Sequence, residues 1–73
     1  MALKDAERKA LKTEDIRELA RPELEAELGR LKEARFRLRF RSATESIENT
    51  AQIRILRRNI ARLETILREK AQA

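Results

Sequence analysis

Cysteine and histidine are both absent from the 73 residues of the chain. Their absence excludes a disulfide framework and the usual ligands of a zinc site. It also leaves no histidine to act as a catalytic base and no cysteine to act as a nucleophile, and no glycine-rich phosphate loop is present. We therefore predict that the chain is not an enzyme and that it uses no metal and no cofactor. A chain this short builds only a small core, so we expect a partner to stabilise it.

Aromatic residues, glycine and proline are scarce: there are two Phe, one Gly and one Pro. No apolar run approaches the roughly 20 residues that cross a bilayer, and the first dozen residues, MALKDAERKALK, mix both charges and are unlike a signal peptide. The remaining composition is typical of long helices. We expect an all-α, cytoplasmic protein that binds no membrane and has no small-molecule substrate.

Positive charge is abundant and unevenly distributed. Residues 1–31 carry 7 basic and 8 acidic side chains, whereas residues 32–73 carry 11 basic and 5 acidic ones. Arginine outnumbers lysine by 13 to 5, and its planar guanidinium suits phosphate better than an ammonium does. A solvated helical surface does not require such segregation, so the second part of the chain is the expected docking surface for a polyanion.

Two apolar seams predict two long helices, at about 22–43 and 50–71, with a turn over residues 42–49. In both helices the apolar residues recur at steps of three, four or seven, which keeps them on one side. The seams are Leu24, Leu28, Leu31 and Leu38, and Ile53, Leu56, Ile60, Leu63 and Leu67. Because the turn is short, the seams face each other in an antiparallel two-helix hairpin.

Shorter elements precede and link these helices. We expect residues 1–12 to form an extension, helical over 2–12, and residues 13–73 to form the hairpin domain. Thr13 is the expected N-cap of a short helix that ends near Leu19, and Asn49 is the expected cap of the second long helix. Pro22 fits the first turn of the first long helix.

The arginines of the second long helix point away from its seam. With Ile53 at zero and about 100° per residue, the other seam residues fall between roughly −80° and −20°. Arg57, Arg54, Arg58 and Arg62 fall at roughly 40°, 100°, 140° and 180°, and Thr65 falls near 120°. Like charges four residues apart repel each other on a lone helix, so this row is expected to bind an anionic partner such as a phosphate backbone.

A second basic stretch, ARFRLRFRS, covers residues 34–42. On a helix its four arginines, Arg35, Arg37, Arg39 and Arg41, spread over several faces. Phe36 and Phe40 lie away from the seam, and two interpretations stay open for them. Either they pack against the N-terminal segment, or they are buried when the chain docks on a protein or on RNA.

Two other classes of function fit part of this pattern. A free basic coiled-coil adapter would pair two hairpins as a homodimer through the same heptads. An amphipathic helix on an anionic membrane surface is the weaker alternative, because the apolar face is small.

Residues 15–71 resemble bacterial large-subunit ribosomal protein L twenty-nine. The resemblance lies in DIRELARPEL, in FRLR at 36–39, in IENTAQIR at 47–54 and in RRNIARLETILREK at 57–70. Four positions differ from the family's usual pattern: Ala20 stands in place of serine, Arg41 in place of glutamine, and Glu45-Ser46 in place of Gly-Gln. The first dozen residues extend beyond the family's usual start.

The resemblance implies a ribosome-bound helical hairpin on the large-subunit (23S) ribosomal RNA, near the exit of the peptide tunnel. It implies ribosomal protein L twenty-three as a neighbour and proximity to factors at the tunnel exit. Phe36 and Phe40 are candidates for protein contact. The candidate RNA-binding residues are Arg35, Arg37, Arg39, Arg41, Asn49, Arg54, Arg57, Arg58, Arg62 and Thr65.

Overall fold

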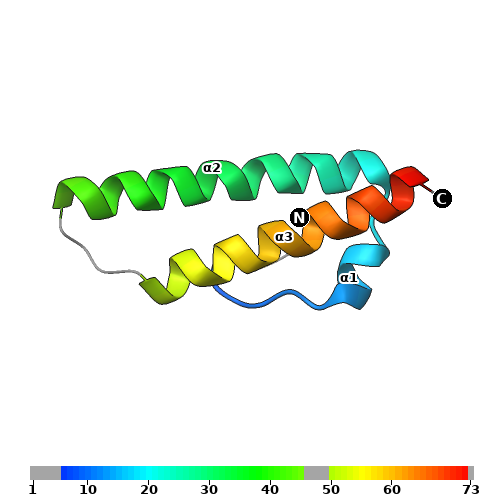
Figure 1. The fold of residues 1–73 in the computed structure, drawn as a ribbon, viewed down its shortest axis with the longest axis horizontal. Helices are drawn as coiled ribbons and strands as arrows, with labels where there is room; N and C mark the ends of the chain where they lie inside the picture. The colour runs from blue at the N-terminus through cyan, green and yellow to red at the C-terminus, as the bar shows by residue number, and fades with distance from the viewer. Residues whose placement is uncertain (1–5, 46–49, 73) are drawn as a thin grey trace.

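The computed structural model describes residues 6–45 and 50–72. It contains α1 (Thr13–Arg17), α2 (Arg21–Glu45) and α3 (Thr50–Gln72). Figure 1 shows α2 and α3 side by side and antiparallel, with α1 at the end of the hairpin where α2 begins and α3 ends. The predicted all-α hairpin is confirmed.

The start of α2 is fixed by a side chain of its own first turn. The Ala20 N–H donates to Glu23 Oε1 at 3.1 Å, which satisfies a backbone donor that a helix start leaves unpaired. Pro22 stands in the same turn, where its missing N–H costs nothing. Because the alanine at position 20 cannot cap the helix with its own side chain, Glu23 is the group that does so.

The long helices extend slightly further than predicted. α2 continues to Glu45 instead of ending near residue 43, so the helix takes up the first part of the predicted turn. Ser42 is a weak helix former but does not break a helix. The helix therefore continues through the first small hydroxyl residues, which were expected to end it. The predicted cap at Asn49 lies outside the described residues.

The core lies between the two predicted seams. Leu24 and Leu31 of α2, with Leu56 and Leu63 of α3, are fully buried, and Leu38 and Ile60 are nearly so. Leu28, Ile53 and Leu67 pack against this core while partly exposed. The apolar seams therefore meet as predicted, and their burial is the main favourable term in the stability of the hairpin.

α1 packs against the last turns of α3. Ile16 of α1 is fully buried, as is Ile66 of α3, which was not predicted as part of the seam. Lys70 Nζ donates to the Arg17 carbonyl at 3.1 Å, next to an Arg17–Glu69 ion pair at 3.5 Å. Thr13 is the first residue of α1 and not its N-cap; Lys12 holds the N-cap position without a side-chain cap bond.

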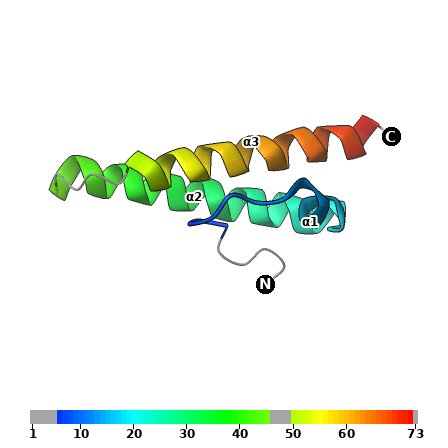
Figure 2. The ribbon, with the colours of Figure 1, turned by 90° about the horizontal axis from the view of Figure 1, so that it is seen from below.

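Of the helix expected over residues 2–12, the structure describes residues 6–12, and these are not helical. Residues 6–12 form a turn followed by irregular backbone, and Figure 2 shows this stretch running along the hairpin towards α1. Its polar backbone groups bind a side chain of α3 (below), which replaces the hydrogen bonds that a helix would provide. We call residues 6–11 the N-terminal strap. Among the helices of the described residues, none combines the length and apolar character needed to cross a bilayer.

Candidate nucleic-acid interface

The basic residues of the hairpin fall into two groups, paired and unpaired. Ion pairs within the described residues involve Arg17 with Glu69, Arg21 with Glu25, Arg30 with both Glu7 and Glu27, Lys32 with Glu64, and Arg37 with Glu33. No ion pair among these residues involves five of the candidates: Arg35, Arg39, Arg54, Arg57 and Arg58. These five arginines therefore carry positive charge that no ion pair among the described residues neutralises.

The five unpaired arginines lie towards the turn end of the hairpin. Because α2 and α3 are antiparallel, the C-terminal part of α2 lies beside the N-terminal part of α3 (Figure 1). The sequence has no acidic residue over 34–44 and none over 49–63. Acidic side chains are more frequent at the other end, around α1 and the start of α2. Although Glu45 ends α2, arginines outnumber acidic residues towards the turn end, which is therefore basic.

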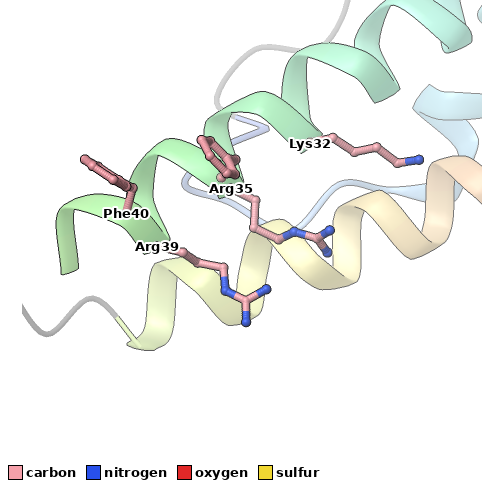
Figure 3. Close-up of a pocket in the computed structure, with 5 residues that line it drawn as sticks. Lys32, Arg35, Arg39 and Phe40 are labelled. Carbon is pink, nitrogen blue, oxygen red and sulfur yellow. The ribbon is translucent and has the colours of Figure 1, made fainter. Parts of the chain in front are cut away.

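One flank of α2 carries basic and aromatic side chains together. Lys32, Arg35 and Arg39 reach towards α3, whereas Phe40 points to the other side (Figure 3). Phe36 and Phe40 are 69% and 62% exposed. Packing of these rings against the N-terminal segment, the first of the two open interpretations, is therefore wrong. The segment lies on the opposite flank of α2, where Glu7 pairs with Arg30 at 3.0 Å.

The arginines of α3 point in three directions. Arg57 and Glu64 are seven residues apart and so share a flank, and because Glu64 pairs with Lys32 at 3.5 Å, Arg57 faces the same side as the basic flank of α2. Arg54 and Arg58 are exposed on the outer side, as predicted. Arg62 is different: its Nη1 donates to Asn59 Oδ1 at 3.0 Å and it is half-buried.

The remaining candidates are distributed over other parts of the surface. Arg37 and Arg41 lie on the flank of α2 that faces the strap, and both line a polar cavity there. Thr65 is exposed, and its hydroxyl donates to the Ala61 carbonyl within α3 at 2.9 Å. The predicted set thus does not form one face, which agrees with the expected spread of the four arginines at 35–41.

Asn59 is the residue that sequence reasoning missed. Its side chain is fully buried, and Nδ2 donates to the carbonyls of Ala6 at 2.6 Å and Lys9 at 2.9 Å. Oδ1 accepts from the Leu11 N–H at 3.0 Å and from Arg62. One amide therefore fixes the strap at three backbone atoms. The available signal was the place of this asparagine at about −120° on the helical wheel, beside the seam.

Comparisons with known proteins agree with this architecture. The sequence model for the ribosomal L29 protein matches residues 14–70, which is most of the chain. The chain belongs to the ribosomal L29 family. The strap precedes the matched range, so the family model does not include it.

Relatives in several bacteria support the assignment. The chain is 52% identical to the large ribosomal subunit protein uL29 of Gemmatimonas aurantiaca over 63 residues, covering 86% of this chain and 94% of the relative. It is 49% identical to the protein of the same name from Geobacillus stearothermophilus, over 86% of this chain and 96% of the relative. It is 50% identical to that of Natranaerobius thermophilus, over 82% and 92%. No solved structure matches the chain at a significant level.

Proposed function

We propose that the chain is a structural constituent of the large ribosomal subunit and binds its ribosomal RNA through the unpaired arginines of the hairpin. Membership of the ribosomal L29 family supports the assembly, since the relatives are named as proteins of the large subunit. The position near the peptide tunnel exit and the cytoplasmic location on the ribosome are expectations from the family. The role is structural and involves no catalysis.

The observation that carries the proposal is the concentration of five arginines without acidic partners at the turn end. Five guanidiniums at that density repel one another. A phosphate backbone would neutralise them and release its condensed counterions, which makes binding favourable and strongly salt-dependent. The arginines at the α1 end, such as Arg17 and Arg21, already have carboxylate partners.

Individual residues have different parts in this proposal. Arg35, Arg39 and Arg57 present guanidiniums on the flank away from the strap, and Arg54 and Arg58 present them on the outer side of α3. These residues position the hairpin on phosphates and do not read bases. Thr65 and Arg62 lie beyond this group, towards α1.

Phe36 and Phe40 are proposed to contact a neighbouring protein, for which ribosomal protein L twenty-three is the family's expected candidate. Both rings are exposed and four residues apart, so they lie on one side of α2. Exposed large apolar side chains that are rimmed by polar groups mark interaction surfaces. Lys32, Arg35 and Arg39 form that rim, and with the rings they line a cavity of about 490 Å³.

The first experiment follows the chain from a cell lysate through a sucrose gradient at increasing salt. We expect co-sedimentation with the large subunit, with release at high salt. In the double variant Arg54→Ala, Arg58→Ala, release should occur at clearly lower salt, because each lost phosphate contact reduces the salt slope by about 0.7–0.9. Arg62 is not replaced, because it also bonds to Asn59. Its removal would affect folding as well as RNA binding.

Arg21→Ala is the matched control. It removes an exposed arginine that pairs with Glu25 at the α1 end, and it should leave the release curve unchanged. Circular dichroism of each variant checks that helix content is preserved. If the chain runs at the top of the gradient as a discrete dimer at every salt concentration, it is the free coiled-coil adapter and the ribosomal proposal is wrong.

A further inference from the structure

A polar cavity of about 360 Å³ lies where the N-terminal strap crosses the flank of α2. Its lining includes Arg8 of the strap, Arg37 and Arg41 of α2, and Gln52 of α3. Glu7 is the one acidic residue among the residues that line it. Three guanidiniums and an amide thus come from three separate parts of the chain to surround one cavity with a positive charge excess.

We propose that this cavity binds a phosphodiester of the RNA backbone, and that the N-terminal strap exists to place Arg8 there. The inference rests on the proposed function, because it assigns one further RNA contact to the same docked hairpin. It adds to the RNA contacts a residue outside the matched family range of residues 14–70, since Arg8 precedes that range. Arginine is suited to this ligand because its planar donors bind two phosphate oxygens at once.

The residues on both sides of Arg8 are bound to the hairpin. On one side, Arg30 Nη1 donates to Glu7 Oε2 at 3.0 Å. On the other, Asn59 Nδ2 donates to the Lys9 carbonyl at 2.9 Å, and the same amide also holds Ala6. These contacts reduce the conformational entropy that Arg8 loses on binding, which is the benefit of preorganisation. Asn59 is therefore a positioning residue for the cavity.

Arg37 is also positioned before any ligand arrives. Its Nη2 donates to Glu33 Oε1 at 2.6 Å, one turn earlier on α2. A guanidinium has five N–H donors in a fixed fork, so this bond leaves donors for a phosphate oxygen. The bond to Glu33 therefore orients the Arg37 side chain and leaves further N–H donors for a ligand.

The strap is held by polar contacts and has little apolar burial of its own. Ala6 is buried and Leu11 is half-buried, whereas Arg8, Lys9 and Ala10 are exposed. Stability of the hairpin alone would favour a larger apolar anchor. A segment that buries little yet places one arginine beside two others fits a binding role.

The test measures the salt dependence with which the full-length chain binds large subunits that lack it, by co-sedimentation over a range of KCl concentrations. Arg8→Ala should weaken binding about three- to tenfold and reduce the salt slope by about 0.9, as expected for one lost phosphate contact. Lys9→Ala is the matched control, because it removes the same charge from the next residue, which does not line the cavity. It should weaken binding less than about twofold.

A double-mutant cycle tests the role of Asn59. In the background of Asn59→Asp, which removes the donors that hold Ala6 and Lys9, Arg8→Ala should change binding less than about twofold. If Arg8→Ala keeps its full effect there, Asn59 does not position Arg8 and that part of the inference is wrong. Circular dichroism confirms that each variant is folded.

The outcomes separate this inference from the proposed function. If the wild-type chain binds the subunit and Arg8→Ala behaves like Lys9→Ala, the phosphate site is refuted and the ribosomal role stands. If the wild-type chain does not bind the subunit at any salt concentration, both fail. Selective weakening by Arg8→Ala, absent in Lys9→Ala, supports the site.

Discussion

Replacing Asn59 with aspartate exchanges the amide NH2 of a fully buried side chain for a carboxylate oxygen, and tests which hydrogen bonds hold the strap. Nδ2 donates to two backbone carbonyls, those of Ala6 and Lys9. In the variant a carboxylate oxygen faces both carbonyl oxygens, so two hydrogen bonds worth about 1 kcal/mol each are lost. Oδ1 keeps its bonds from Leu11 and Arg62, and the Arg62 guanidinium stabilises the new charge in part.

The expected net effect is a loss of about 2–3 kcal/mol in the free energy of unfolding. A core of this size supplies only about 3–5 kcal/mol in total, so the loss is a large share of the stability. Urea unfolding followed by far-ultraviolet circular dichroism at low temperature measures it. The midpoint should fall clearly while the slope stays similar.

A shortened chain that begins at Ala10 is the control for this prediction. Without residues 1–9, the carbonyls of Ala6 and Lys9 are absent and Nδ2 faces water. Asn59→Asp should then cost less than about 0.5 kcal/mol. An equal loss in the full and shortened chains would refute the reasoning, because it would mean that the amide acts within the hairpin and not on the strap.

Three further substitutions have defined outcomes. Gly29→Ala should stabilise the chain by about 1 kcal/mol in urea unfolding, because Gly29 lies inside α2 and an added Cβ meets no atom within 4 Å; a loss of stability would contradict this. Ser42→Ala should be neutral or stabilising by up to about 1 kcal/mol in thermal unfolding, because Ser42 Oγ is buried and has no hydrogen-bond partner among the described residues. The double variant Phe36→Ser, Phe40→Ser should change the free energy of unfolding by no more than about 0.5 kcal/mol, because both rings are exposed. In a pull-down with this variant, the recovery of ribosomal protein L twenty-three should fall. Unchanged recovery would argue against the protein contact.

The hairpin could be predicted from the sequence because its two seams have the same period and face each other. Leu24, Leu31, Leu56 and Leu63 are fully buried as their spacing required. Ile66 is buried although it does not fit the heptad steps. It packs in the core cluster that includes Ile16 of α1, and a short helix with one buried residue has no period that could reveal its partner.

The strap could not be predicted for a related reason. Its attachment to α3 depends on hydrogen bonds between one side chain and backbone atoms. Because every residue has such backbone atoms, the residue types of the strap do not reveal these bonds. Residues 2–12 have the composition of a helix, so local propensity favoured one. The Asn59 amide instead binds Ala6, Lys9 and Leu11 across about 50 positions of sequence, and such tertiary contacts override propensity.

The directions of the arginines followed from helix geometry, but their pairing did not. Arg62 was predicted to point outward with Arg54 and Arg58, yet its Nη1 donates to Asn59 Oδ1, one turn earlier on α3. Which arginines remain unpaired depends on where the acidic residues lie once α2 and α3 are antiparallel. Acidic residues near α1 pair with the basic side chains at their end of the hairpin, whereas no ion pair among the described residues neutralises the five unpaired arginines near the turn end. The strap, which lies outside the matched family range, brings Arg8 beside Arg37 and Arg41 of α2, and by our proposal it extends the surface on which a polyanion would dock.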